Sequence, residues 1–162
     1  MKLLLHDLNR SPAEAGPDRT VLGPGGVGCR PCLGCFGCWV KTPGACVIRD
    51  GVGDMGALLA RCDRVDIVSR CRYGGFSPFV KNVLDRSIPY LHPDFVYKNG
   101  EMHHRRRYQN AVSLWVWFYG GGLAPAVRET AKALVEANAV NLAWTVGAVR
   151  FFTGPEEWEE LV

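Results

Sequence analysis

Four cysteines, Cys32, Cys35, Cys38 and Cys46, form the densest group of potential ligands in the sequence, with the spacing C-x2-C-x2-C-x7-C. Four thiolates in one short loop can ligate a [4Fe–4S] cluster, which binds cysteine sulfur and tolerates short spacings. Zinc is a second possibility, although structural zinc sites usually join two separated ligand pairs. The thiols can also pack as small apolar side chains without a metal. These alternatives stay open at this point, and Cys29 is a spare thiol in each.

Three other segments carry residues typical of ligand sites, and each lies at the end of a predicted strand or directly after it. Polar donors, glycines, arginines and tyrosines can approach a phosphate or a flat ring closely. The alternative is that the glycines only form turns and the arginines only face solvent. The candidate residues are Asn9, Arg10, Ser11, Ser69, Arg70, Arg72, Tyr73, Gly74, Gly75, Tyr119, Gly120 and Gly121.

Two further groups are weaker signals. His6 and Asp7 end the first predicted strand, where a catalytic pair could lie, but no third partner is evident and satisfied polar groups are the simpler interpretation. The segment HHRRRY, residues 103–108, could contact nucleic acid, although a solvated loop or subunit contact explains it as well. We expect the tryptophans at 115, 117 and 144 to fill a core or an interface.

Composition excludes several classes of protein. The 162 residues are 48% hydrophobic and 22% charged with a net charge of +3, which is typical of one globular domain and too small to indicate nucleic-acid binding. No apolar run approaches a membrane span, and the amino terminus lacks the pattern of a signal peptide. We therefore expect a cytoplasmic protein, in which seven cysteines indicate metal or redox chemistry rather than disulfides.

The elements that would position these residues alternate between strand and helix. Apolar runs predict strands over 2–8, 64–71, 110–122 and 143–152, with a brief extended segment at 20–22. Helical spacing predicts helices after Asp54, after Ser77 and over about 15 residues from Pro125, with a short helix in the acidic tail. The strand over 110–122 is apolar on both faces, as expected of a central parallel strand that is covered on both sides. Residues 92–110 are polar and basic and are predicted to form a loop.

This alternation predicts a single α/β domain over residues 1–162, with an open doubly wound parallel sheet of about five strands. Ligands of such sheets bind at the carboxyl ends of the strands, near the switch in strand order. The loops after Leu8, Ser69 and Tyr119 are therefore the expected walls of a site.

The sequence resembles the flavodoxin-like family of NADPH-dependent FMN reductases and iron–sulfur flavoproteins. The matching segments are CLGCFGCWVKTPGACVIRDG, CDRVDIVSRCRYGGFSPFVKNVLDR and EMHHRRRY. The resemblance implies bound FMN and a homodimer or larger oligomer. It also implies electron transfer between NAD(P)H and a small-molecule or protein acceptor. Within it, the four cysteines correspond to the compact iron–sulfur motif.

One departure from this family affects the cofactor. HDLNRSPAEAGPDRT stands where the family carries a phosphate-binding loop and a long first helix, so we expect that helix to be missing or shortened. Without it the positive end of a helix dipole is absent from the phosphate site, and FMN should bind weakly or not at all. The alternative function is therefore a flavodoxin-like binding or scaffold protein that has lost FMN.

Overall fold

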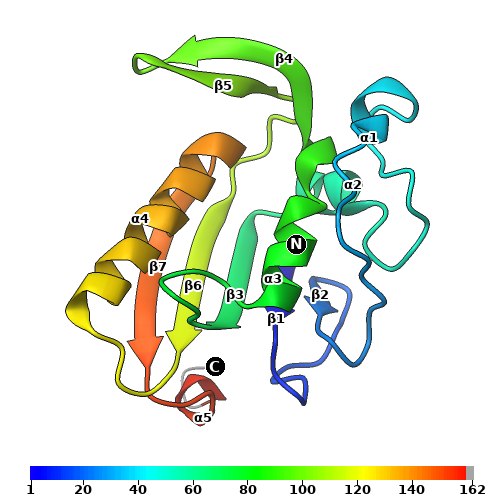
Figure 1. The fold of residues 1–162 in the computed structure, drawn as a ribbon. Helices are drawn as coiled ribbons and strands as arrows, with labels where there is room; N and C mark the ends of the chain where they lie inside the picture. Colours follow the sequence, from blue (N-terminus) through cyan, green and yellow to red (C-terminus); the bar gives the residue numbers. More distant parts are fainter. Residues whose placement is uncertain (160–162) are drawn as a thin grey trace.

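Five parallel strands form one sheet in the computed structural model, which describes residues 1–159 (Figure 1). The strand order is β2-β1-β3-β6-β7, with all four neighbouring pairs parallel, so the predicted doubly wound sheet is confirmed. The strands are β1 (Lys2–His6), β2 (Arg19–Leu22), β3 (Arg64–Arg70), β6 (Ser113–Tyr119) and β7 (Thr145–Phe152).

Three helices cover one face of this sheet. They are α2 (Met55–Ala60), α3 (Pro78–Asp85) and α4 (Pro125–Leu142). Their apolar side chains share one buried cluster with Leu3, Leu5, Val65, Ile67, Leu114, Val116 and Phe118 of the strands. The helix starts follow the sequence, because Asp54 and Ser77 occupy the N-cap positions and proline begins α3. Neither N-cap side chain makes a capping bond; Ser77 instead donates its backbone N–H to the Ser69 hydroxyl at 2.9 Å.

The opposite face of the sheet is thinly covered. The first helix of a doubly wound fold is missing, because residues 7–18 run from β1 to β2 without a helix, as predicted. Among the described residues the four-residue α5 (Glu156–Glu159) is the only helix on this face, where its Trp158 joins a small cluster with Leu4, Leu8 and Val68. Trp115 and Trp117 are consequently half-buried, so β6 is fully covered on one face only, in contrast to the sequence prediction. Trp144 is buried, as expected.

The prediction of a loop over 92–110 is wrong. Strands β4 (Leu91–Lys98) and β5 (Glu101–Arg106) pair antiparallel and form a hairpin that projects from the body at the top of Figure 1. Asn99 and Gly100 turn the chain with φ angles of 53° and 83°, the left-handed conformation of a tight hairpin turn. Its solvent-facing side chains include the apolar Phe95, Val96, Tyr97 and Met102, but these are interspersed with charged and polar residues, so hydrophobic periodicity did not indicate strands.

The cysteine segment lies between β2 and α2. It contains one short helix, α1 (Gly37–Val40), and packs near the 3-10 turn η1 (Ile88–Tyr90) that follows α3. The predicted tail helix is confirmed over α5, and residues 160–162 lie outside the described residues. Within residues 1–159, no helix has both the length and the apolar character needed to cross a membrane.

Candidate functional site

The carboxyl ends of β1, β3 and β6 meet at the lower edge of the sheet in Figure 1. Asp7 directly follows β1 and hydrogen-bonds to the ends of the other two strands. The Tyr119 hydroxyl donates to Asp7 Oδ1 at 3.0 Å, and the Arg70 backbone N–H donates to Asp7 Oδ2 at 2.9 Å. One carboxylate thus joins three strand ends. The sequence indicated Asp7 as a weak candidate and Tyr119 as a separate one, and the structure brings the two together.

The Asp7 carboxylate changes the protonation behaviour of Tyr119. Burial and the neighbouring Asp7 carboxylate raise the pKa of Tyr119 to about 12, although Arg70 and Arg72 act in the opposite direction. Tyr119 therefore stays protonated and keeps its hydrogen bond to Asp7 over the physiological pH range. A depression of about 270 Å³ adjoins the pair and is lined by Asn9, Arg10 and Glu156, among others. It carries two carboxylates, Asp7 and Glu156, against one guanidinium.

His6 is buried and lies beside this junction rather than in it. Its Nδ1 accepts the Leu8 backbone N–H at 3.2 Å, and burial lowers its pKa, which favours the neutral ring with the proton on Nε2. The ring packs directly on the backbone of Gly23, where a Cβ atom would lie 2.3 Å from it. With Asn9 and Ser11 it lines a neighbouring open cavity of about 630 Å³. Asn9, Arg10 and Ser11 are all exposed.

The loop after β3 is a tight turn. Arg72 and Gly75 exchange two backbone hydrogen bonds of 2.9 and 2.8 Å, and Tyr73 and Gly74 between them have φ angles of 51° and 80°. Gly74 packs against α4, where a Cβ atom would lie 2.7 Å from Thr130. The Gly75 N–H is bonded within the turn, so it is not free for a ligand. Of the two glycines expected to approach a ring, Gly75 therefore has no N–H to offer it.

Tyr73 is the side chain that this turn presents. It is 99% exposed, and its left-handed backbone is unfavourable for a bulky residue by about 1 kcal/mol. An exposed aromatic ring on a strained backbone is typical of a binding position. Arg70 and Arg72 flank the turn and are exposed as well.

The remaining predicted residues at this edge have internal roles. Ser69 is fully buried, and its hydroxyl donates to the Arg70 carbonyl and accepts the Ser77 N–H, so it braces the end of β3 against the start of α3. Gly120 donates its N–H to Phe152 at 3.1 Å. Gly121 is exposed in the turn that leads to α4.

The four cysteines predicted as metal ligands lie near one another, but in the described structure they are not gathered around a metal position. Burial raises the pKa of the Cys38 thiol, and Cys46, Cys32 and Cys35 raise it further, so all three other thiols lie within electrostatic reach of Cys38. Cys46 is buried, Cys32 and Cys38 are half-buried and Cys35 is exposed. Nevertheless, in the described part of the chain no three cysteine, histidine or acidic side chains are close enough together to hold a metal ion.

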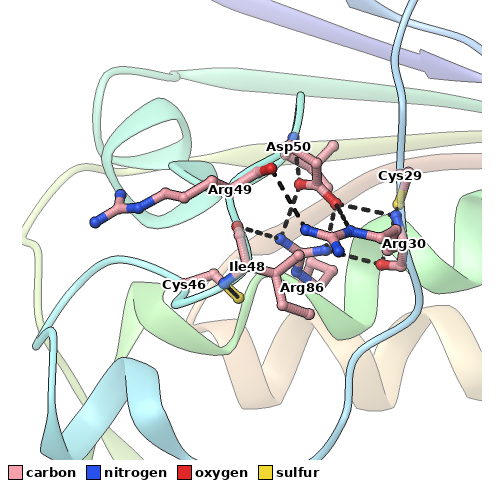
Figure 2. Close-up of polar contacts among 8 residues, drawn as sticks. Cys29, Arg30, Cys46, Ile48, Arg49, Asp50 and Arg86 are labelled. Carbon is pink, nitrogen blue, oxygen red and sulfur yellow. Dashed lines mark hydrogen bonds and ion pairs between the residues drawn. The ribbon is translucent and has the colours of Figure 1, made fainter.

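A buried ion pair fixes both ends of the cysteine segment to the domain (Figure 2). Arg86, one residue beyond α3, donates to both Asp50 carboxylate oxygens at 2.9 Å. The same guanidinium donates to the carbonyl of Arg30 at 2.8 Å and to that of Ile48 at 3.2 Å. We call this group the Arg86 clamp. It joins residues before Cys32 and after Cys46, so it closes the intervening segment into a loop.

The Arg86 clamp was not predicted from the sequence. The Arg86 side chain is fully buried and that of Asp50 is 10% exposed. Burial would lower the pKa of Arg86, but Asp50 and Cys46 outweigh it and raise the pKa. The hydrogen bonds from Arg86, with those from the Arg30 and Val52 N–H groups, lower the pKa of Asp50 to about 2. Both groups are therefore charged at neutral pH.

The basic segment 103–108 is largely occupied within the chain. His103 contacts Asn141 of α4 at 3.0 Å, and His104 lies between Trp39 and Phe95. Arg107 donates to the carbonyls of Pro89 and Leu91, and Tyr108 stacks on Tyr90. These contacts support a structural role and leave few free groups for nucleic acid.

Comparisons with known proteins identify the fold of the chain but not its family. Neither a protein-family model nor a curated protein matches the chain. A solved structure, that of the Trp repressor binding protein from Bacillus subtilis, is similar with a TM-score of 0.51 and 12% sequence identity. The match covers 95% of this chain and 86% of that one. Together with the observed strand order, this similarity shows that the chain has a flavodoxin-like α/β fold.

Proposed function

We propose that this chain is a flavin-dependent oxidoreductase that moves electrons between NAD(P)H and a small acceptor. The observation that carries the proposal is the turn of residues 72–75, which presents the fully exposed Tyr73 ring at the carboxyl edge of a flavodoxin-like sheet. Ligands of such sheets bind at that edge, beside the switch between β1 and β3. A flavin bound there would supply the redox chemistry, and the chain would supply position and electrostatics.

The residues at this edge fit a flat ring better than they fit a phosphate. Tyr73 is free to stack on a ring, and the exposed Arg70 and Arg72 can balance negative charge on a reduced flavin or on a nicotinamide nucleotide. At the phosphate end, however, Asp7 places a carboxylate at the switch point, and no helix begins there. A phosphate dianion would be repelled by Asp7 and would lack the donors of a helix amino terminus. We therefore infer that this site recognises the ring system of a flavin and does not recognise its phosphate.

Asp7 also favours a second candidate function. If its charge excludes FMN altogether, the chain is a flavodoxin-like binding protein that uses the same exposed edge for another molecule. The absence of a helix over residues 7–18 supports this alternative equally. The two functions differ in one property, which is whether a bound flavin can be reduced.

An anaerobic reduction experiment distinguishes them. The protein is incubated with riboflavin or FMN, freed of unbound flavin and mixed with NADPH or NADH while the flavin absorbance near ~450 nm is followed. We expect bleaching by one nicotinamide cofactor at a rate above that of free flavin. Protein that retains no flavin, or that retains it without accelerated bleaching, would favour the binding protein. Tyr73→Ala is the matched variant, because its side chain makes no buried contact in the fold.

A further inference from the structure

Three basic side chains form a row across the thinly covered face of the sheet. Lys2 on β1 is the register partner of both Arg19 on β2 and Arg64 on β3. Register partners of parallel strands project to the same face, and neighbouring strands lie about 4.8 Å apart. Like charges side by side on a sheet are destabilising. A contribution to fold stability therefore does not explain why these three basic residues lie side by side.

Nearby carboxylates compensate the row only in part. Asp66, two residues along β3, accepts hydrogen bonds from Arg64 at 2.8 and 2.9 Å and neutralises it. Asp63 lies near Lys2, but its carboxylate binds the amino group of Met1 at 2.9 Å. Within residues 1–159, Lys2 and Arg19 form no ion pair.

A cavity of about 260 Å³ opens over this row, and Trp117 and Trp158 form part of its wall. The indole N–H of Trp117 is buried and has no acceptor among the described residues. The cavity thus combines two cations that form no ion pair within residues 1–159 with two aromatic rings. Lys2, Arg19 and Arg64 of its lining are the first residues of β1, β2 and β3, and the cavity shares no lining residue with the depression beside Asp7 and Tyr119, so the two sites are separate.

We propose that this cavity binds a small phosphate monoester whose organic part is a flat ring. Lys2 and Arg19 would hold the phosphate, since two unpaired cations match a dianion and arginine suits phosphate geometry. Trp117 and Trp158 would contact the ring. The volume lies slightly below the usual range for drug-sized ligands, about 300–1,000 Å³, which favours a compact molecule.

Phenyl phosphate is the direct probe, because it joins the two chemical groups in one small molecule. Binding is measured by calorimetry and by the change in tryptophan fluorescence, with inorganic phosphate, benzoate and phenol as comparison ligands at constant ionic strength. We expect phenyl phosphate to bind at least tenfold more tightly than each comparison ligand. Equal binding of benzoate would overturn the assignment to phosphate, and no response to phenyl phosphate would overturn the site.

Variants separate a built site from general attraction by positive charge. Arg19→Gln should lower the affinity for phenyl phosphate at least tenfold. It should also raise the midpoint of thermal unfolding, because one of the like charges is removed. Trp117→Ala removes one of the two rings from the cavity wall, and it should weaken binding severalfold.

Arg150→Gln is the matched control. Arg150 is the register partner of Trp117 on β7, so it projects to the same face, but it does not line the cavity. Its substitution should leave the affinity unchanged. An equal loss in Arg19→Gln and Arg150→Gln, or no loss in Arg19→Gln, would contradict the proposal.

Discussion

Replacing Asp50 with asparagine should destabilise the protein strongly and change how its stability depends on pH. The pKa of Asp50 is lowered from 3.8 to about 2, mainly by its hydrogen bonds to Arg86. A difference of this size corresponds to about 2 kcal/mol of stability that is present above about pH 4. Since the folded-state pKa is the lower one, this stability is lost as the pH falls from about 4 to about 2. Asp50→Asn removes that dependence.

The loss of unfolding free energy in Asp50→Asn at neutral pH should exceed the pH-dependent contribution of about 2 kcal/mol. Asparagine leaves the fully buried Arg86 guanidinium without a counter-charge, and breaking one partner of a buried pair costs about 3 kcal/mol. Urea unfolding at pH 7, repeated in steps down to pH 2.5, measures both quantities. Asp85→Asn is the control, because Asp85 pairs with Lys81 on the surface and such pairs contribute about 0.5 kcal/mol.

The same variant tests whether the Arg86 clamp closes the cysteine segment. Cys46 is buried in the native chain, so its alkylation requires local opening. Asp50→Asn should increase the alkylation rate of Cys46 at least tenfold, whereas Asp85→Asn should not change it. The reasoning is refuted if Asp50→Asn loses less than about 1 kcal/mol at pH 7, or if it keeps the acid dependence of the native chain.

Four further outcomes are expected. Tyr73→Asn should leave the free energy of unfolding unchanged or raise it by up to about 1 kcal/mol, since asparagine tolerates the left-handed backbone, while flavin affinity falls; a clear loss of stability by urea unfolding would contradict this. Asp7→Asn should increase FMN affinity relative to riboflavin about tenfold in a fluorescence titration, because one repulsive charge is removed. Anaerobic reconstitution with iron and sulfide should give less than about one iron per chain, because the described thiols are not gathered; about four, lost in Cys35→Ser, would show that the loop closes around a cluster. Light scattering should give at least twice the chain mass of 17.9 kDa, and a monomer would refute the expected oligomer.

The sheet could be predicted because each strand and helix carries its own local signal. β1, β3 and β6 are apolar runs, and helix starts such as Ser77 with Pro78 have recognisable caps. The hairpin was missed because its apolar residues are few and interspersed with charged residues and Pro93, so neither strand shows a clear apolar run. The Asn99–Gly100 pair was the available signal, since this dipeptide favours the left-handed turn of a two-residue hairpin loop.

The site was only partly predictable, because its contacts join residues far apart in the chain. Asp7 and Tyr119 meet across β3, and their shared position at strand ends was a usable signal. The pairing of Arg86 with Asp50 had no such signal, because the two residues lie in different segments of the chain and the burial of a charge depends on how the whole loop closes. The half-buried state of Trp115 and Trp117 likewise follows from the missing helix, which the sequence of the strand itself does not encode.

The ratio of the FMN and riboflavin dissociation constants tests the central claim most directly. Both flavins are titrated into the native chain at constant ionic strength, and the quenching of flavin fluorescence is followed. Because Asp7 and the missing helix weaken the phosphate end while Tyr73 remains available to the ring, we predict that the two constants agree within about threefold. Binding of FMN a hundredfold tighter than riboflavin, or no binding of either flavin, would contradict the account.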